Sequence, residues 1–291
     1  MERYKMNQLN MEKLAQGIFF TIALISVIVI FLICFFLFVN ALPVFSQIGL
    51  VEFVTGKEWA PTDNPAYFGI LPMILGSLYI TAGAIVIGVP VGVFTAIFLA
   101  CFCPYALYKL IKPCVNLLAG IPSIIYGFFG LMVIVPVIKI FFGGNGNTIL
   151  TASLLLGIMI LPTVISVSES AIKAVPKNYY EGALALGASH ERSVFFVVLP
   201  AVASGVMASI VLGIGRAVGE TMAVIMVAGN QARMPEGFLK GIRSLTANIV
   251  LEMGYAADLH KDALIATGVV LFILILLVNI SFMLVMRRAR I

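Results

Sequence analysis

The stretch that decides the fold reads EGALALGASHERSVFFVVLP, from Glu181 to Pro200. Strong helix formers follow Glu181, Gly187 suits the left-handed conformation that ends a helix, and Ser189 can cap a second helix. Asn178 is expected to cap the first helix, with Glu181 as its capping-box partner. The stretch therefore predicts a short helix, a sharp turn and a second short helix, exposed between apolar segments where a soluble partner can bind.

The composition around this stretch is that of an integral membrane protein. Of the 291 residues, 62% are hydrophobic and 11% are charged, whereas about a quarter of the residues of a soluble domain are charged. The net charge of +5 is expected from basic loops on the cytoplasmic leaflet, so it indicates no nucleic-acid site. The four cysteines lie in or beside apolar segments and are interpreted as small membrane residues rather than metal ligands.

Gaps between charges predict six transmembrane helices. A span needs roughly 20 apolar residues, and an isolated segment in lipid must satisfy its own backbone hydrogen bonds. The first apolar segment is too long for a signal peptide and is expected to be retained. The expected fold is thus an all-α integral membrane protein, with spans at residues 17–40, 72–102, 114–141, 148–168, 199–229 and 263–286.

Basic residues set the expected orientation. The side with both termini and residues 181–200 carries 11 Lys and Arg residues, and the other side carries fewer. By the positive-inside rule, both termini and this stretch are expected in the cytoplasm. On the outer side, Trp59 and Tyr67 suit the interfacial belt, and the spacing of Leu245, Ile249 and Met253 indicates a short helix.

The fifth span is unusual because it contains Arg216 and Glu220. Each charge at membrane depth costs about 2.5–3.5 kcal/mol on insertion scales. In one continuous helix the two residues share a face, either to line a transport path or to neutralise each other as a structural lock. Small residues at four-residue steps are expected to let another helix approach, as a path between two subunits needs: Gly205, Ser209, Gly213, Ala217 and Thr221.

The third span offers hydroxyls beside a proline. Ser123 and Tyr126 follow Pro122 and can line a pore, or they can be satisfied locally next to a helix kink. The sequence contains no Walker A motif and no catalytic constellation. Energy for any transport is therefore expected from outside this chain.

The opening stretch resembles the EAA loop of ABC-importer permeases, with Gly182 where that family usually has Ala. Three further stretches, Gly120–Gly127, Gly215–Ala223 and Leu245–Gly254, are similar to one subfamily, the phosphate permeases of the PstC type. Five residues carry the resemblance to the EAA loop, and the resemblance implies that they contact an ATPase. They are Glu181, Ala183, Gly187, Leu199 and Pro200.

The resemblance implies a MetI-like permease core made of spans two to six, preceded by an added N-terminal span. Residues 1–71 would precede the core at 72–291, and a cytoplasmic coupling loop would lie at about 169–200. It also implies a translocation path for phosphate, formed with a second permease. The residues that this path is expected to include are Arg216, Glu220, Ser123, Tyr126 and Thr221.

The implied assembly lies in the prokaryotic cytoplasmic (inner) membrane. It contains a second permease of the PstA type, two ATPase subunits of the PstB type that use ATP and Mg, and an extracytoplasmic phosphate-binding protein of the PstS type. The chain itself is expected to bind no cofactor and to be no enzyme. The alternatives are an ABC permease for another oxyanion and an ion-coupled carrier acting alone, for which an ATPase dock has no use.

Overall fold

The computed structural model describes residues 2–288, and the side chains of residues 12–284. Its long helices are α1 (Glu2–Gln47), α3 (Leu71–Ile97), α7 (Ile149–Lys173), α11 (Ala203–Val218) and α14 (Asp258–Arg288). The shorter α-helices are α2 (Leu50–Thr55), α4 (Tyr105–Gly120), α5 (Ser123–Phe129), α6 (Val135–Phe142), α8 (Lys177–Ala185), α9 (His190–Ser193), α10 (Leu199–Ala201), α12 (Met222–Val227) and α13 (Leu245–Glu252). Strands β1 (Trp59–Ala60) and β2 (Tyr67–Phe68) pair antiparallel.

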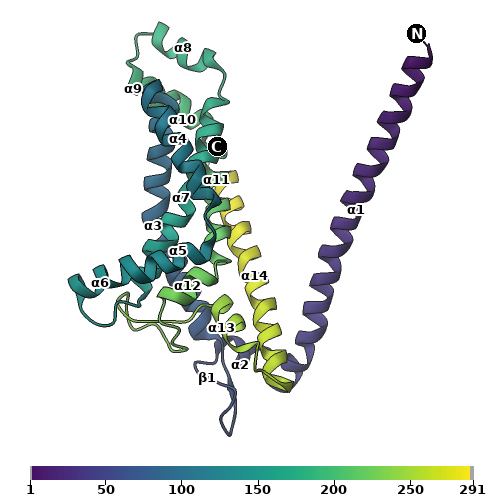
Figure 1. Ribbon diagram of the computed structural model, residues 1–291, viewed down its shortest axis with the longest axis vertical. Coiled ribbons are helices and arrows are strands. Elements are labelled where there is room, and N and C mark those ends of the chain that lie inside the picture. The colour runs from purple at the N-terminus through teal and green to yellow at the C-terminus, as the bar shows by residue number, and fades with distance from the viewer. Residues whose placement is uncertain (1, 289–291) are drawn as a thin grey trace.

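The molecule is an elongated helical bundle with two distinct ends (Figure 1). We call the end with α8 and α9 the loop end, and the end with the β1–β2 hairpin and α13 the hairpin end. Helix α1 lies apart from the bundle over most of its length (Figure 1). Only its last turns pack against α14, where Ala41 and Val44 share a buried cluster with Ala263 and Leu264.

The expectation of an all-α membrane fold with six spans is confirmed. Five helical segments of the described residues are long and apolar enough to cross a membrane, and a bent pair of helices makes a sixth. The five segments are residues 12–47, 71–102, 123–142, 149–173 and 258–284, and the bent pair is residues 190–201 with 203–218.

The fifth span differs from the continuous helix expected over residues 199–229. The chain bends by 69° between α10 and α11, and α11 already ends at Val218. Gly219, Glu220 and Thr221 lie in a break before α12. Hydrogen bonds hold this break in place, because the carboxylate of Glu220 accepts from the N–H of Ala223 and the carbonyl of Glu220 accepts from Thr246.

The third span also differs from its expected start at residue 114. A helix already begins at Tyr105, and it is interrupted at Ile121 and Pro122 before α5. Proline has no N–H to donate and disfavours the helical conformation of the residue before it. The segment that qualifies as a span is therefore 123–142.

Helix α7 is the centre of the bundle because small residues let its neighbours come close. A Cβ on Gly88 of α3 would lie 2.6 Å from the carbonyl oxygen of Gly157, so these backbones can approach only without a side chain there. On the other side, a Cβ on Gly205 of α11 would lie 2.6 Å from the Cβ of Ala171, and Ser209 bonds Ser168 at 2.6 Å. The small-residue row of α11 thus packs on α7 of the same chain, which corrects the expectation of a contact between subunits.

Candidate functional site

The helix–turn–helix predicted for residues 181–200 is present at the loop end. Gly187 has a φ of +85°, and its N–H donates to the carbonyl of Leu184 at 2.9 Å. The N–H of Ala188 donates to the carbonyl of Ala183 at 3.1 Å, which completes a Schellman motif at the end of α8. Ser189 then caps α9 by accepting from the N–H of Arg192 at 3.3 Å.

The expected capping box at Asn178 and Glu181 is wrong. Helix α8 begins at Lys177, directly after Pro176, and no side chain caps it. Pro176 has an extended ψ of 132°, and the next residue is free to turn into the helix at once. Glu181 therefore lies inside α8 with an exposed side chain.

The turn presents apolar side chains to the surroundings. Leu186 is 91% exposed and Leu184 is 39% exposed, while Ala183 is buried against the bundle. Leu199 and Pro200 begin α10, one half-buried and the other exposed. Exposed leucines at the tip of a short, well-capped turn are suited to a hydrophobic notch on a partner.

His190 fastens this loop to the bundle, which the sequence reasoning missed. One ring nitrogen bonds the hydroxyl of Tyr180 at 2.8 Å and the other bonds the carbonyl of Cys101 at 3.2 Å. The ring of Phe102 packs 4.7 Å from the imidazole, centroid to centroid. Since Cys101 is 89 residues away in sequence, no local pattern indicates this contact.

Arg216 and Glu220 do not pair. The guanidinium of Arg216 donates to the hydroxyl of Thr163 on α7 at 3.3 Å. A carboxylate oxygen of Glu220 accepts from the N–H of Ala223 at 3.2 Å and so satisfies the start of α12. The ion pairs formed by the side chains of residues 12–284 include none between Arg216 and Glu220. Because α11 ends at Val218, the two residues do not share a helix face, and that expectation is wrong.

Glu220 instead borders a small cavity of about 10 Å³ with a mixed polar and apolar lining. Hydroxyl groups of Ser77 and Thr81 on α3 and of Ser244 line the same space. Such a volume holds about one water molecule. The hydroxyl of Thr246 also donates to the carbonyl of Glu220 at 3.0 Å, which holds the break in place.

The other predicted path residues lie near this break with different surroundings. Tyr126 is buried in the same cluster as Ala217 and Ala223, and its hydroxyl donates to the carbonyl of Leu118 at 2.8 Å. Thr221 stands at the start of α12 and donates to the carbonyl of Gly219 at 3.3 Å. Ser123, the first residue of α5, is half-buried.

The hairpin end is organised around the buried carboxylate of Glu252 on α13. It accepts from the indole N–H of Trp59 at 2.9 Å, from Arg243 at 2.5 Å and from His260 at 2.9 Å. Trp59 is only 7% exposed, so its expected place in an interfacial belt is wrong. The predicted short helix from Leu245 is confirmed as α13.

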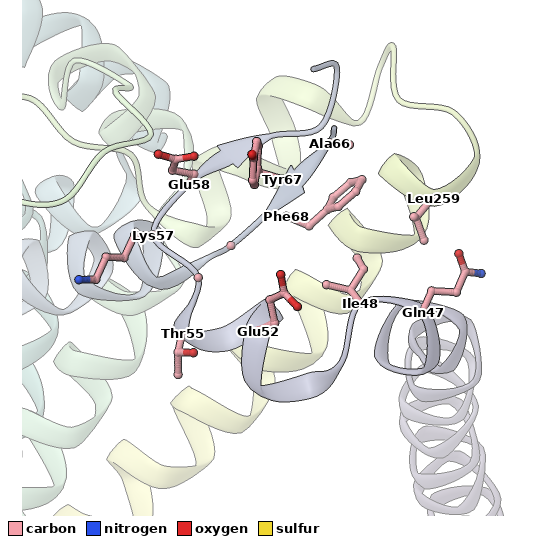
Figure 2. Close-up of a pocket in the computed structure, with 12 residues that line it drawn as sticks. Gln47, Ile48, Glu52, Thr55, Lys57, Glu58, Ala66, Tyr67, Phe68 and Leu259 are labelled. Carbon is pink, nitrogen blue, oxygen red and sulfur yellow. The ribbon is translucent and has the colours of Figure 1, made fainter. Parts of the chain in front are cut away.

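A pocket of about 740 Å³ opens beside the hairpin (Figure 2). Figure 2 shows the carboxylate of Glu52 pointing toward the side of the pocket with Ile48 and Phe68, and Glu58 lies just before β1. The lining combines two carboxylates, the ammonium of Lys57 and apolar side chains, so it is suited to a polar surface of a partner.

Apolar spans around a polar break, together with an exposed helix–turn–helix loop, are the features of a membrane permease. The chain belongs to the family described as "Binding-protein-dependent transport system inner membrane component", which matches residues 88–291. Residues 88–291 include the loop, the broken span and α14.

Relatives of known name support this membership over most of the chain. The chain is 38% identical over 257 residues to the "Probable ABC transporter permease protein YqgH" of Bacillus subtilis, covering 87% of this chain and 83% of that protein. It is 36% identical over 248 residues to the "Phosphate transport system permease protein PstC" of Mesorhizobium japonicum, covering 78% and 75%.

Solved structures share the fold at lower identity. The MetNI methionine ABC transporter in an inward-facing conformation matches with a TM-score of 0.61 at 20% identity, over 76% of this chain and 95% of that chain. A bacterial alginate ABC transporter matches with a TM-score of 0.65 at 15% identity, over 94% and 95%. These matches confirm the MetI-like permease fold.

Proposed function

We propose that the chain is the transmembrane permease subunit of an ATP-driven phosphate importer and forms the translocation path with a second permease. The observation that carries the proposal is the broken fifth span, with Arg216 and Glu220 held apart at membrane depth. Similarity to permeases named PstC over three quarters or more of both chains points to phosphate as the substrate.

The two charges suit a protonated oxyanion. Arginine presents a planar fork of N–H donors that matches two phosphate oxygens. Hydrogenphosphate also carries a proton, and the carboxylate of Glu220 can accept its hydrogen bond. Ser123, Tyr126 and Thr221 complete the proposed wall with hydroxyl groups. The water-sized cavity at Glu220 is too small for the anion, so the wall must open during transport.

The loop end is the proposed docking site for the ATPase subunits of the PstB type. The proposed coupling loop contains Glu181, Ala183, Gly187, Leu199 and Pro200. Its most exposed large apolar side chain is Leu186, which is 91% exposed. ATP and Mg would be bound by those partners, because this chain contains no Walker A motif.

A second permease of the PstA type would pack on the free face of α11. Ser204, Ala208 and Leu212 of α11 are exposed, as is Gly219 just after it, and among the described residues a Cβ built on Gly215 would meet nothing within 4 Å outside its own helix turn. This face is separate from the row that packs on α7. Small side chains let a partner helix approach closely in lipid, and Arg216 lies beside this face.

The proposed orientation places the loop end and both termini in the cytoplasm of a prokaryotic cell. The hairpin end then faces outward, where a phosphate-binding protein of the PstS type would dock near the pocket of Figure 2. In this arrangement residues 1–71 form an added span before the permease core at 72–291.

The test is the ATPase activity of the reconstituted complex with its binding protein, compared with phosphate, arsenate and sulfate. Stimulation by phosphate and arsenate but not sulfate is expected, since sulfate carries no proton for Glu220 at neutral pH. Stimulation by sulfate alone would identify a permease for another oxyanion. Uptake by the chain without any ATPase would instead identify a carrier that acts alone.

A further inference from the structure

One face of α7 carries a row of hydroxyl groups in the half of the helix nearer the loop end. Thr163, Ser166 and Ser170 are separated by three and four residues, so they lie along one helical face, and Lys173 continues the row. The row is about 15 Å long at a rise of 1.5 Å per residue.

This face is exposed on a helix that is otherwise deeply packed. The most apolar part of α7 is 67% buried, the highest share among the five unbroken spans. Ser170 is nevertheless exposed, and Thr163 and Ser166 are half-buried. The hydroxyl row therefore coincides with a gap in the packing around α7.

Cations from two neighbouring helices are held against the row. Arg216 of α11 donates to the hydroxyl of Thr163 at 3.3 Å, and Lys112 of α4 donates to the hydroxyl of Ser166 at 3.3 Å. Lys173, with 43% of its side chain exposed, ends the row near the loop. Three positive charges thus follow one another along this face.

One buried carboxylate, that of Glu169 on α7, pairs with two of these cations. Glu169, whose side chain is 3% exposed, accepts from Lys112 at 2.8 Å and from Lys173 at 2.6 Å. The hydroxyl of Tyr108 donates to it as well, at 2.8 Å. Three cations against one carboxylate leave two positive charges in excess between Thr163 and Lys173, and one when Glu220 at the break is included. Arg216 at membrane depth would cost about 2.5–3.5 kcal/mol if it faced lipid, so this end of the row is expected to face a polar path.

We propose that this face is a binding path for a tetrahedral oxyanion between the break at Glu220 and the loop end. We call it the α7 track, defined by Thr163, Ser166, Ser170, Lys112 and Lys173. The proposal rests on the proposed function and extends it to residues that the broken span does not contain.

The chemistry of the track fits an anion that must move. The ammonium groups of Lys112 and Lys173 are donors only, and the hydroxyls can donate to an oxyanion once it arrives. Adjacent positions are about 5 Å apart along the helix axis, from three or four residues of rise. Several weak sites in series allow an anion to bind and still leave, as conduction requires.

A structural role makes different predictions from a path. If Lys112 only neutralises Glu169 and fastens α4 to α7, removing both charges together restores a sound contact. If Lys112 belongs to the track, removing both charges still takes a cation away from the anion. The two readings also differ in which charged reagents reach Ser166 and Ser170.

The first experiment measures reagent access in the reconstituted complex, with the native cysteines replaced. Ser166→Cys and Ser170→Cys are reacted with a sulfonate-bearing and a trimethylammonium-bearing methanethiosulfonate. The anionic reagent is expected to react faster by roughly tenfold, because the excess positive charge concentrates anions. Ser281→Cys is the matched control, since Ser281 is exposed on α14 and donates only to the carbonyl of Leu277 in its own helix.

Equal rates for the two reagents, or rates no higher than at Ser281→Cys, would overturn the track. This readout needs no phosphate. If the complex transports another oxyanion, the proposed function is wrong, but the thiol-labelling result still tests the α7 track.

The second experiment measures anion uptake per assembled complex for Lys112→Gln, Lys112→Arg and the double variant Lys112→Gln/Glu169→Gln. Lys112→Arg is expected to retain most of the uptake, and both variants without the cation are expected to lose most of it. Parent-level uptake in the double variant would overturn the proposal, because it would leave Lys112 only its pairing with Glu169.

Discussion

Arg216 donates to Thr163 at 3.3 Å across the contact between α11 and α7, while Glu220 turns to the N–H of Ala223 at 3.2 Å. The two charges of the fifth span thus occupy separate polar surroundings. A structural lock, in which each charge exists to neutralise the other, does not describe this geometry. Their substitution is therefore expected to affect transport more than assembly.

Arg216→Gln and Glu220→Gln are each expected to lower phosphate uptake per assembled complex by roughly 10- to 100-fold. This factor corresponds to the loss of about 1.5–3 kcal/mol for a hydrogen bond to a charged group. Arg216→Lys keeps the charge but loses the planar fork, so a partial defect is expected. Because the charges are not paired, the double neutral variant should transport no better than either single one, and recovered uptake would refute separate roles.

The left-handed conformation of Gly187 gives a test of the coupling loop. Gly187→Val forces a branched residue to a φ of +85°, which costs at least about 1–2 kcal/mol. Weaker co-purification with the ATPase, or ATP hydrolysis without uptake, is expected in a chain that still inserts. Gly187→Asn is the matched control, because asparagine tolerates this conformation and should retain most of the coupling. Full coupling in the valine variant would contradict the proposed role of the loop.

Local chemistry made the helix–turn–helix at residues 181–200 predictable. The glycine at 187 and the serine at 189 act on their own neighbours, so a few residues of sequence are sufficient to place the turn and the second helix. The prediction for Asn178 was wrong because α8 already begins at Lys177, directly after Pro176, and an exposed helix start does not require a side-chain cap. The six spans were predictable because a run of apolar residues and a lack of charge are properties of the segment itself.

Contacts between distant segments were not predictable in this way. Trp59 and Glu252 are 193 residues apart, so an indole that suits an interfacial belt by type is buried instead. The break at Glu220 depends on Thr246, and the position of Arg216 depends on Thr163. The overall apolar character of residues 199–229 hides such a break. Gly219 followed by two polar residues was nevertheless a signal that the helix could end there.

The buried node at Glu252 is expected to stabilise the hairpin end. Glu252→Leu leaves Arg243, with 17% of its side chain exposed, without its charged partner, which is expected to cost about 3–5 kcal/mol. Trp59→Phe removes one hydrogen bond and leaves the ion pair intact, so its effect should be clearly smaller. Thermal unfolding of the purified complex measures both, and equal melting temperatures for Glu252→Leu and the parent would contradict the node.

The proposed orientation is testable with single cysteines in a cysteine-free chain. Lys57→Cys and Lys240→Cys lie toward the hairpin end and should react with an impermeant thiol reagent added outside sealed cells. Leu186→Cys should not react from outside, although residue 186 is 91% exposed, and it should react once the membrane is opened. Leu186 is exposed to solvent in either orientation. Its reaction with the impermeant reagent therefore depends only on whether the loop end faces the cytoplasm or the outside. Labelling of Leu186→Cys from outside would place the loop end away from any cytoplasmic ATPase and remove the docking site from the proposed mechanism.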